Sequence, residues 1–560
     1  AEAPGSAEQA AVSDDAKARK TPPKTAVRVH HLGAGAVQAL LDAAGCVDAD
    51  AAWHDLTRRI HEASAVTPVV PSTLRAELRE YQAEGFAWLS RLSRWAGGAC
   101  LADDMGLGKT VQTIAVLLEQ APHGPSVILA PTSVCHNWEN EITRFAPTLT
   151  CHRFTGTREA RAERVRSLGA GDILVASYGL LHTEIETLAT RAWRMAVFDE
   201  AQALKNAETK RARASKQIPA VFRVALTGTP IENYLEDLWS LFATICPGLL
   251  GTKQSFQRRF SGPIGAGGIG PVGSGVKLIG QGALGGTGAG EARQALKALV
   301  RPFILRRTKS AVLTELPPRT EQIIEVDLPE DERAFYEALR RHALEELEKK
   351  KAEQDVETGV ASSQKFTILT ELTKLRRACC HPALIDPQTR LKGAKLTAFM
   401  ELVGELVRGG HKALVFSQFV GHLAQVRHAL DVARLPYQYL DGSTPERERQ
   451  RSVKAFQSGE GDLFLISLKA GGQGLNLTAA DYVIHLDPWW NPAVEDQASD
   501  RAHRMGQERP VTVYRLVIRD SVEERILKLH RSKRSLAADF LEGTDSSAAL
   551  SENELLALLT

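Results

Sequence analysis

The stretch Leu101–Thr110, "LADDMGLGKT", decides the fold of this 560-residue chain. It ends like the phosphate-binding pattern G-x-x-x-x-G-K-[ST], but Asp103 stands where that pattern has its first glycine. A short run, "ACLA", precedes the loop, and the apolar-periodic run "VQTIAVLLEQ" follows it. Strand, loop and helix in this order are the setting that a phosphate-binding loop needs.

The residue types in the loop suit phosphate binding. Gly106 and Gly108 would let the backbone approach and point N–H groups at phosphate oxygens. Lys109 would place a positive charge at the outer phosphates, and Thr110 would offer a hydroxyl to Mg²⁺. Taken alone, the imperfect loop is equally compatible with a glycine turn before an ordinary helix.

A pair of carboxylates favours the first interpretation. In "MAVFDEAQ" an apolar strand ends in Asp199 and Glu200, at the strand edge where open α/β sheets bind ligands. Asp199 can hold Mg²⁺, and Glu200 can orient and deprotonate a water. Acidic residues also cap helices at such positions, so the pair alone is moderately specific.

An arginine pair lies far along the chain, in "EDQASDRAHRMGQ". If this stretch is helical, Arg501 and Arg504 lie on one face and could reach a γ-phosphate from a second domain. Alone, the pair would be read as surface arginines. Together, loop, carboxylates and arginines predict a nucleotide-driven motor.

Short β-branched runs alternate with amphipathic stretches along most of the chain, which is typical of parallel sheets covered by helices on both faces. We therefore predict two α/β lobes, at residues 72–260 and 390–540. Residues 261–389 would hold a glycine-dense flexible insert, Ser261–Gly290, and helical protrusions. The predicted strands are "SVILAP", "DILVAS", "MAVFDE" and "RVALTGT", then "KALVFSQ", "YQYLDG", "LFLISL", "DYVIHLD" and "VTVYRLVI".

The ends and the bulk composition carry less information. Residues 1–71 read as a linker followed by a small helical segment, and residues 541–560 as a tail. The formal charge of +2 does not argue for a nucleic-acid partner, and no apolar run is long enough to span a membrane. The start of the chain has no signal pattern, so we expect a cytoplasmic protein with no membrane partner.

The cysteines predict no metal site. Seven are scattered without a C-x-x-C pair, which favours a reducing compartment without disulfides or a zinc ribbon. "CCHP" contains Cys379, Cys380 and His381, but adjacent side chains on a helix diverge. We interpret these three residues as packing residues.

An ordered set of motifs resembles helicase superfamily two, and specifically the Swi/Snf family of DNA-translocating ATPases. The set runs from about Leu74 to about Phe540. In that family the loop commonly begins with acidic residues, as it does here at Asp103 and Asp104. The motifs are "ELREYQAEGFAWL", "LADDMGLGKT", "LAPTSVCHNW", "FDEAQALKN", "LTGTPIEN", "LVFSQF", "LISLKAGGQGLNLT" and "WWNPAVEDQASDRAHRMGQ".

The resemblance implies two RecA-like lobes with ATP and Mg²⁺ bound at their junction, and it implies roles for further residues. Gln82 would read the adenine edge, Thr227 and Thr229 would couple the nucleotide to DNA, and Gln497 would face the nucleotide. The rest of the implied ATP contacts are Asp104, Met105, Gly106, Leu107, Gly108, Lys109, Thr110 and Gly474. The implied DNA contacts are Thr132, Lys469, Gly471, Gly472 and Trp490, although Trp490 reads equally well as a core aromatic.

"LTKLRRACCHP" also looks like a block of this family, from the region that joins the lobes. We therefore expect an ATP-dependent translocase that moves along double-stranded DNA at the nucleoid and remodels protein–DNA complexes. A protein partner or a larger complex is an additional candidate partner. A strand-separating DNA or RNA helicase is the first alternative. A catalytically inactive DNA-binding scaffold is the second, and the complete set of hydrolytic residues disfavours it.

Overall fold

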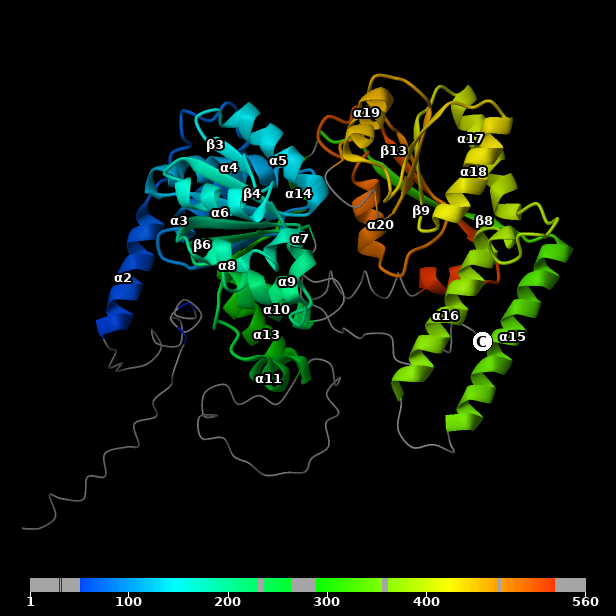
Figure 1. Ribbon diagram of the computed structural model, residues 1–560, viewed down its shortest axis with the longest axis horizontal. Coiled ribbons are helices and arrows are strands. Elements are labelled where there is room, and N and C mark those ends of the chain that lie inside the picture. Colours follow the sequence, from blue (N-terminus) through cyan, green and yellow to red (C-terminus); the bar gives the residue numbers. More distant parts are fainter. Residues whose placement is uncertain are drawn as a thin grey trace, which may run out of the picture.

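Two parallel α/β lobes lie side by side in the structure (Figure 1). This arrangement confirms the predicted fold class. The expected linker, most of the glycine-dense insert and the tail fall outside the part of the chain that is described. The structure is a computed structural model that describes residues 30, 32, 51–228, 235–262, 289–313, 315–354, 361–468, 470 and 475–528.

The sheet of the first lobe has seven strands within the described residues, all parallel, in the order β3-β4-β2-β5-β6-β1-β7. Strands β1 and β2 are buried at every residue, because the sheet is covered on both faces. Strand β5, which ends in Asp199, lies inside the sheet between β2 and β6. The strands are Gly98–Leu101 (β1), Ser126–Ala130 (β2), Thr150–Arg153 (β3), Asp172–Ser177 (β4), Trp193–Asp199 (β5), Ala220–Leu226 (β6) and Ile304–Leu305 (β7).

Helices surround this sheet and bury a continuous apolar core against it. The run after the loop, which we expected to be helical, forms α4. The helical segments of this lobe are α2 (Ala51–Ala65), α3 (Glu80–Leu92), α4 (Lys109–Gln120), η3 (Ala121–His123), α5 (Thr132–Phe145), α6 (Arg158–Ser167), α7 (Tyr178–Leu181), α8 (Ile185–Ala189), η4 (Ala201–Leu204), α9 (Lys210–Ser215), α10 (Leu235–Ile245), α11 (Lys253–Phe256), η5 (Gln257–Ser261), α13 (Ala289–Val300) and η6 (Arg301–Phe303).

The second sheet has six strands within the described residues, also all parallel, in the order β10-β11-β9-β12-β13-β8. Successive residues of β9 face opposite sides: Val415 joins the core under α17 and α18, while Leu414 joins the core on the other face. The strands are Arg319–Val326 (β8), Ala413–Ser417 (β9), Tyr437–Leu440 (β10), Leu463–Ser467 (β11), Tyr482–His485 (β12) and Val511–Ile518 (β13).

The long α15 and α16 pack against each other beside the second lobe (Figure 1). They are the helical protrusion that we expected between the lobes. The helical segments here are α14 (Lys309–Val312), α15 (Glu330–Gln354), α16 (Ala361–Cys380), η7 (Pro382–Leu384), α17 (Ala394–Arg408), α18 (Val420–Val432), α19 (Glu446–Gln457) and α20 (Pro492–Ser499).

All ten predicted strands are present, counting "ACLA" as β1, but three more were not predicted: β3 at the edge of the first sheet, and β7 and β8 inside the range that we assigned to the insert and protrusions. Strand β7 is only two residues long and joins β1 of the first sheet. Strand β8 is an edge strand that pairs only with β13 and is largely exposed, so it carries no apolar run. Of the residues in these three strands only Val326, at the end of β8, is buried.

Among the described residues, no helix has both the length and the apolar character that crossing a bilayer requires.

Candidate nucleotide site between the lobes

The phosphate loop is a tight turn between β1 and α4. Gly106 and Gly108 have φ angles of 85° and 75°, in the left-handed region that favours glycine. A Cβ atom at Gly108 would lie 2.4 Å from Gln82 Nε2, so a larger residue would collide with α3. Lys109 Nζ donates to the carbonyl oxygens of Asp103 and Asp104, at 2.6 and 3.1 Å. The glycines are therefore required by the loop's own geometry.

Asp103, the residue that replaces the first glycine, is fully buried and ion-paired with Arg307. Arg307 Nε lies 3.1 Å from Asp103 Oδ1, and Arg307 Nη2 lies 2.6 Å from Asp103 Oδ2. Arg307 also donates to Gln112 Oε1 at 2.9 Å and to the carbonyl of Tyr81. The acid thus fastens the loop to the segment after β7 through a two-point charged bond.

Asp104 connects the loop to the second lobe. Its Oδ2 accepts from the backbone N–H of Lys309 at 3.0 Å. Lys309 Nζ in turn donates to Asp500 Oδ1 at 2.7 Å and to the carbonyl oxygen of His503 at 2.5 Å. The two acidic residues of the loop therefore hold a single segment, and that segment contacts the stretch that carries the arginine pair.

Asp199 is held in place on three sides at the end of β5. Trp138 Nε1 of α5 donates to its Oδ2 at 2.8 Å, and the backbone N–H of Glu200 donates to its Oδ1 at 2.9 Å. The hydroxyl of Tyr178 donates to its carbonyl oxygen at 2.9 Å. The sequence analysis did not predict that Trp138 binds Asp199. The available signal was that a buried indole N–H usually needs an acceptor.

Glu200 has a φ of 48°, which is uncommon for a residue with a side chain. Such a conformation costs on the order of 1–3 kcal/mol and is typical of functional sites. Gln202 Nε2 donates to Glu200 Oε2 at 2.6 Å, and Gln202 Oε1 accepts from Thr227 Oγ1 at 3.0 Å. Gln497 of α20 places its Nε2 at 3.4 Å from both carboxylate oxygens of Glu200. A continuous polar chain therefore runs from the end of β6 to the second lobe.

The charged side chains of the site, Lys109, Asp199 and Glu200, are half-buried. Loss of solvation raises the pKa of Glu200 to about 7, and the negative charge of Asp199 raises it further. Loss of solvation also raises the pKa of Asp199 and lowers that of Lys109. A divalent cation beside the two carboxylates would relieve their repulsion, and Asp199 with Thr110 is the donor set that fits it.

The arginine pair reaches this site from the second lobe. Arg501 is 1% exposed, burial lowers its pKa to about 10, and Glu200 is its strongest charged neighbour. Its Nε and Nη1 atoms have no hydrogen-bond partner within the described residues. Arg504 lies against the loop, since a Cβ at Gly106 would be 2.8 Å from Arg504 Cβ. Unpartnered buried guanidinium donors fit an anion such as a phosphate.

The two arginines do not share a helix face, which our helical interpretation required. Helix α20 ends at Ser499, and both arginines lie in the turns that follow it. The turns nevertheless bring both residues to the loop.

Other predicted ATP contacts lie around the loop. Gln82 Nε2 donates to the carbonyl oxygen of Leu107 at 3.2 Å, so its amide holds the loop, and its contact with adenine stays a prediction. Leu107 is buried against Tyr81. Met105 lies beside Gly228, where a Cβ would be 3.4 Å from Met105 Cγ.

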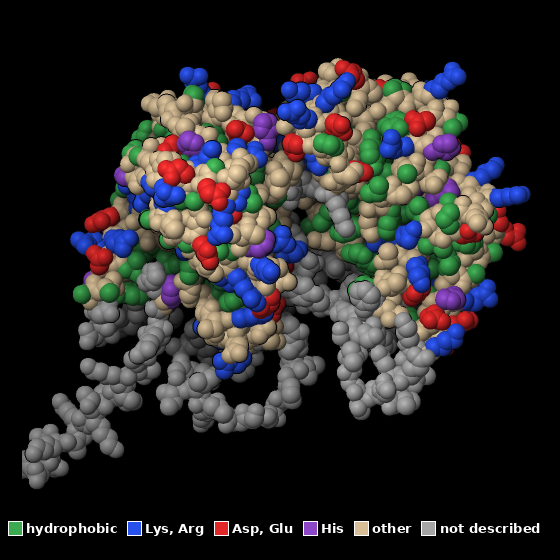
Figure 2. Space-filling model, in the orientation of Figure 1, with side chains coloured by type: hydrophobic (Ala, Val, Ile, Leu, Met, Phe, Trp, Pro, Cys, Tyr) green, Lys and Arg blue, Asp and Glu red, His purple; other side chains and the backbone are tan. Residues whose placement is uncertain are grey.

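The predicted DNA contacts are only partly described. Thr132 is exposed at the first turn of α5, where backbone N–H groups can meet a phosphate. Trp490 packs against the core that α15 and α16 share, and Arg376 lies 4.9 Å from its ring centre, which favours the core interpretation. On the face drawn in Figure 2, Lys and Arg side chains are interspersed with Asp and Glu on both lobes. Outside the described residues lie Thr229, Lys469, Gly471, Gly472 and Gly474.

Comparison with known families agrees with this geometry. The SNF2-related domain matches residues 81–384, and the helicase conserved C-terminal domain matches residues 394–506. The chain belongs to the SNF2-related family. The first match holds the loop and the carboxylates, and the second match holds Gln497 and the two arginines.

Several known proteins are similar to this SNF2-related chain. YwqA of Bacillus subtilis, a candidate ATP-dependent helicase/translocase, is 37% identical over 505 residues, which are 88% of this chain and 52% of YwqA. An uncharacterised ATP-dependent helicase of Mycoplasma pneumoniae is 35% identical, over 86% of this chain and 44% of that protein. The TATA-binding protein-associated factor mot1 of Schizosaccharomyces pombe is 34% identical, over 84% of this chain and 27% of mot1. The chain thus spans about half or less of these relatives.

A solved structure, the Sulfolobus solfataricus SWI2/SNF2 ATPase core in complex with double-stranded DNA, is 34% identical to the chain. The similarity covers 84% of this chain and 96% of the archaeal one, with a TM-score of 0.41.

Proposed function

We propose that this SNF2-related chain hydrolyses ATP with Mg²⁺ and uses the cycle to move along double-stranded DNA and remodel protein–DNA complexes. The observation that carries the proposal is Arg501, a buried arginine of the second lobe with unpartnered donors, held beside Glu200 of the first. A site completed by residues from both lobes responds to its nucleotide by changing how the lobes sit together.

Each residue has a task that its surroundings support. Lys109 would leave the loop carbonyls to bind the outer phosphates, as its reach to Asp103 and Asp104 allows. Mg²⁺, when bound, would neutralise phosphate charge between Thr110 and Asp199. Glu200 would accept a proton from the attacking water. Arg501 would stabilise the charge that builds on the transferred phosphoryl group.

Two connections between the lobes would couple ATP hydrolysis to movement. One runs from the loop through Asp104 and Lys309 to Asp500. The other runs from Glu200 to Gln497. Because both end within the same short stretch of the second lobe, loss of the γ-phosphate would release that stretch from both sides.

Double-stranded DNA is the proposed track because the chain belongs to the SNF2-related family and because its relatives include a helicase/translocase and a TATA-binding protein-associated factor. Contacts to phosphates from loops such as the start of α5 would give binding that is indifferent to sequence and weakens steeply with salt. Such a track would place the protein at the nucleoid in the cytoplasm. A protein partner also stays a prediction.

The first test measures ATP hydrolysis with duplex DNA, single-stranded DNA and RNA. We expect duplex DNA to stimulate hydrolysis most. Glu200→Gln should bind ATP yet stop turnover, because it keeps the shape of the side chain and removes the base. Normal steady-state hydrolysis by Glu200→Gln would contradict the assignment of the base.

The second test separates a translocase from a strand-separating helicase. A motor that grips a duplex should displace the third strand of a triplex without opening the two strands beneath it. The assay therefore pairs triplex displacement with unwinding of a forked duplex, with Glu200→Gln as the blank. ATP-driven unwinding of the fork without triplex displacement would favour the helicase alternative. Duplex binding without any hydrolysis in the wild type would favour the inactive scaffold.

A further inference from the structure

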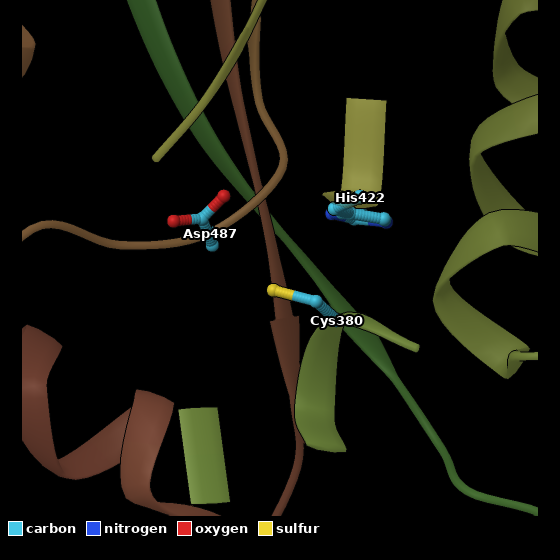
Figure 3. Close-up of side chains that lie close together, drawn as sticks. All are labelled: Cys380, His422 and Asp487. Atoms are coloured by element: carbon cyan, nitrogen blue, oxygen red, sulfur yellow. The ribbon is translucent and has the colours of Figure 1, made fainter. Parts of the chain in front are cut away.

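Three potential metal-binding side chains from distant parts of the sequence meet in the second lobe. Cys380 is the last residue of α16, His422 lies in the first turn of α18, and Asp487 follows β12. One ligand atom of each lies within 4.8 Å of the others, and all three residues are buried. Figure 3 shows the Cys380 sulfur, the His422 ring and the Asp487 carboxylate gathered around one point.

His422 is the residue that a purely structural interpretation leaves unexplained. Its side chain is fully buried, and neither ring nitrogen has a hydrogen-bond partner within the described residues. An unprotonated imidazole offers one ring nitrogen as a donor to a metal. Buried polar groups of folded proteins are rarely left without any partner.

Asp487 forms an ion pair with the buried Arg376, and the backbone N–H of Gln418 donates to both of its carboxylate oxygens at 3.2 and 3.3 Å. Arg376 Nη2 is 3.8 Å from Asp487 Oδ2, which is too long for a hydrogen bond. That nitrogen donates instead to Gln418 Oε1 at 2.7 Å and to the carbonyl oxygen of Pro488 at 2.5 Å. Asp487 Oδ1 accepts from Ser417 Oγ at 2.5 Å, which orients the carboxylate from behind.

A second buried ion pair lies near the three side chains. Lys395 is fully buried and its Nζ lies 2.5 Å from Glu523 Oε2, so this pair adds no net charge.

We propose that Cys380, His422 and Asp487 bind a zinc ion. Sulfur, imidazole nitrogen and carboxylate oxygen are the three donor types that zinc takes in proteins, and the sulfur disfavours Mg²⁺ and Ca²⁺. Binding forms a zinc–sulfur bond and releases the thiol proton to solvent.

The ion would fasten the protrusion to the second lobe. It joins the end of α16 to the start of α18 and to the loop that leads into Trp489 and Trp490. The role is structural, because the set is buried and none of its residues contacts the nucleotide site described above. The proposal departs at Cys380 from our interpretation of "CCHP" as packing residues, whereas Cys379 packs in the α15–α16 core and His381 Nδ1 accepts from the backbone N–H of Ala383.

Metal content of the purified full chain tests the proposal. After expression with added zinc and dialysis, we expect about one zinc per chain by mass spectrometry, as a structural zinc site implies. Cys380→Ser and Asp487→Asn should lose the ion. Asp487→Asn preserves the shape but leaves the buried Arg376 without its anion, so circular dichroism first checks that it folds, and Cys380→Ser carries the test if it does not. Cys379→Ser is the matched control, since it removes the adjacent buried thiol and should keep the zinc.

Cobalt substitution gives a second measurement, which is made on the wild type with Cys379→Ser as its control. In the folded wild type, Co²⁺ bound to Cys380 should give a thiolate-to-cobalt charge-transfer band, and Cys379→Ser should keep that band. A folded wild type with neither zinc nor this band would overturn the proposal. Retention of stoichiometric zinc by both Cys380→Ser and Asp487→Asn would also overturn it, because the ion would then belong to other residues.

Discussion

Removing the guanidinium of Arg307 tests whether Asp103 holds the phosphate loop in place. Arg307→Met keeps much of the apolar stem but removes both bonds to Asp103 and leaves a fully buried carboxylate without its cation. Breaking a buried pair in this way costs about 3–5 kcal/mol. Solvent screens this ion pair only slightly, because its side chains are 11% and 0% exposed, so the cost is not reduced.

The cost should appear in the thermal unfolding of the first lobe. For a unit of 150–250 residues, each kcal/mol lowers the melting temperature by about 2–4 °C, so we expect a drop of about 6–20 °C in its transition. Differential scanning calorimetry measures it. Asp103→Asn with Arg307→Met should lose less than the sum of the single changes, because no buried charge remains.

The exposed pair of Arg519 and Glu325 gives the control. Its side chains are 47% and 52% exposed, and such surface pairs contribute about 0–1 kcal/mol. Arg519→Met should therefore change the melting temperature by only a few degrees. An equal shift for Arg307→Met and Arg519→Met, or strict additivity of Asp103→Asn and Arg307→Met, would refute the role of the pair.

Three further predictions concern the nucleotide site. Arg501→Ala should lower DNA-stimulated turnover about 10³-fold and leave duplex affinity near the wild-type value by fluorescence anisotropy; an equal loss of affinity would make Arg501 a DNA contact. Because Glu200 acts as a base only when ionised and its pKa is about 7, kcat/KM for ATP should fall as the pH drops through 7. At pH 6 about one tenth of Glu200 is ionised, and a flat profile from pH 6 to 8 would contradict this assignment. Lys109→Ala should weaken equilibrium binding of ATP, and unchanged binding would remove Lys109 from the phosphate site.

The strands that sequence reasoning found are those with a local signal. Val127 and Ile128 in β2, or Leu465 and Ile466 in β11, lie in runs that are apolar at every position because both faces of the strand are covered. Strand β8 escaped because its residues are mostly exposed at the sheet edge. The residue that ends a strand also helped to predict the site. Asp199 ends β5, and β5 lies inside the sheet between β2 and β6.

Partners that lie far apart along the chain could not be predicted. Arg307 lies 204 residues from Asp103, and no spacing in the sequence joins them. Trp138 was quoted only as part of a DNA motif, yet its indole holds Asp199. The same limit applies to the cluster around Cys380, because a local reading of "CCHP" concerns only neighbours on one helix.

The acidic start of the loop can now be given a physical reason. The usual first glycine lets a phosphate loop turn without outside help, whereas here Asp103 and Asp104 fix the turn by binding one segment, at Arg307 and at the backbone N–H of Lys309. That segment continues directly into β8 of the second sheet. A movement of the loop on nucleotide binding would therefore displace the chain that links the lobes. The side chain of Asp104 and the backbone N–H of Asp104, which donates to the carbonyl oxygen of Arg307 at 3.0 Å, make the same connection without the side chain of Asp103. The exchange of glycine for aspartate thus strengthens this connection with a charged bond, and the cost is a loop whose stability depends on a buried charge.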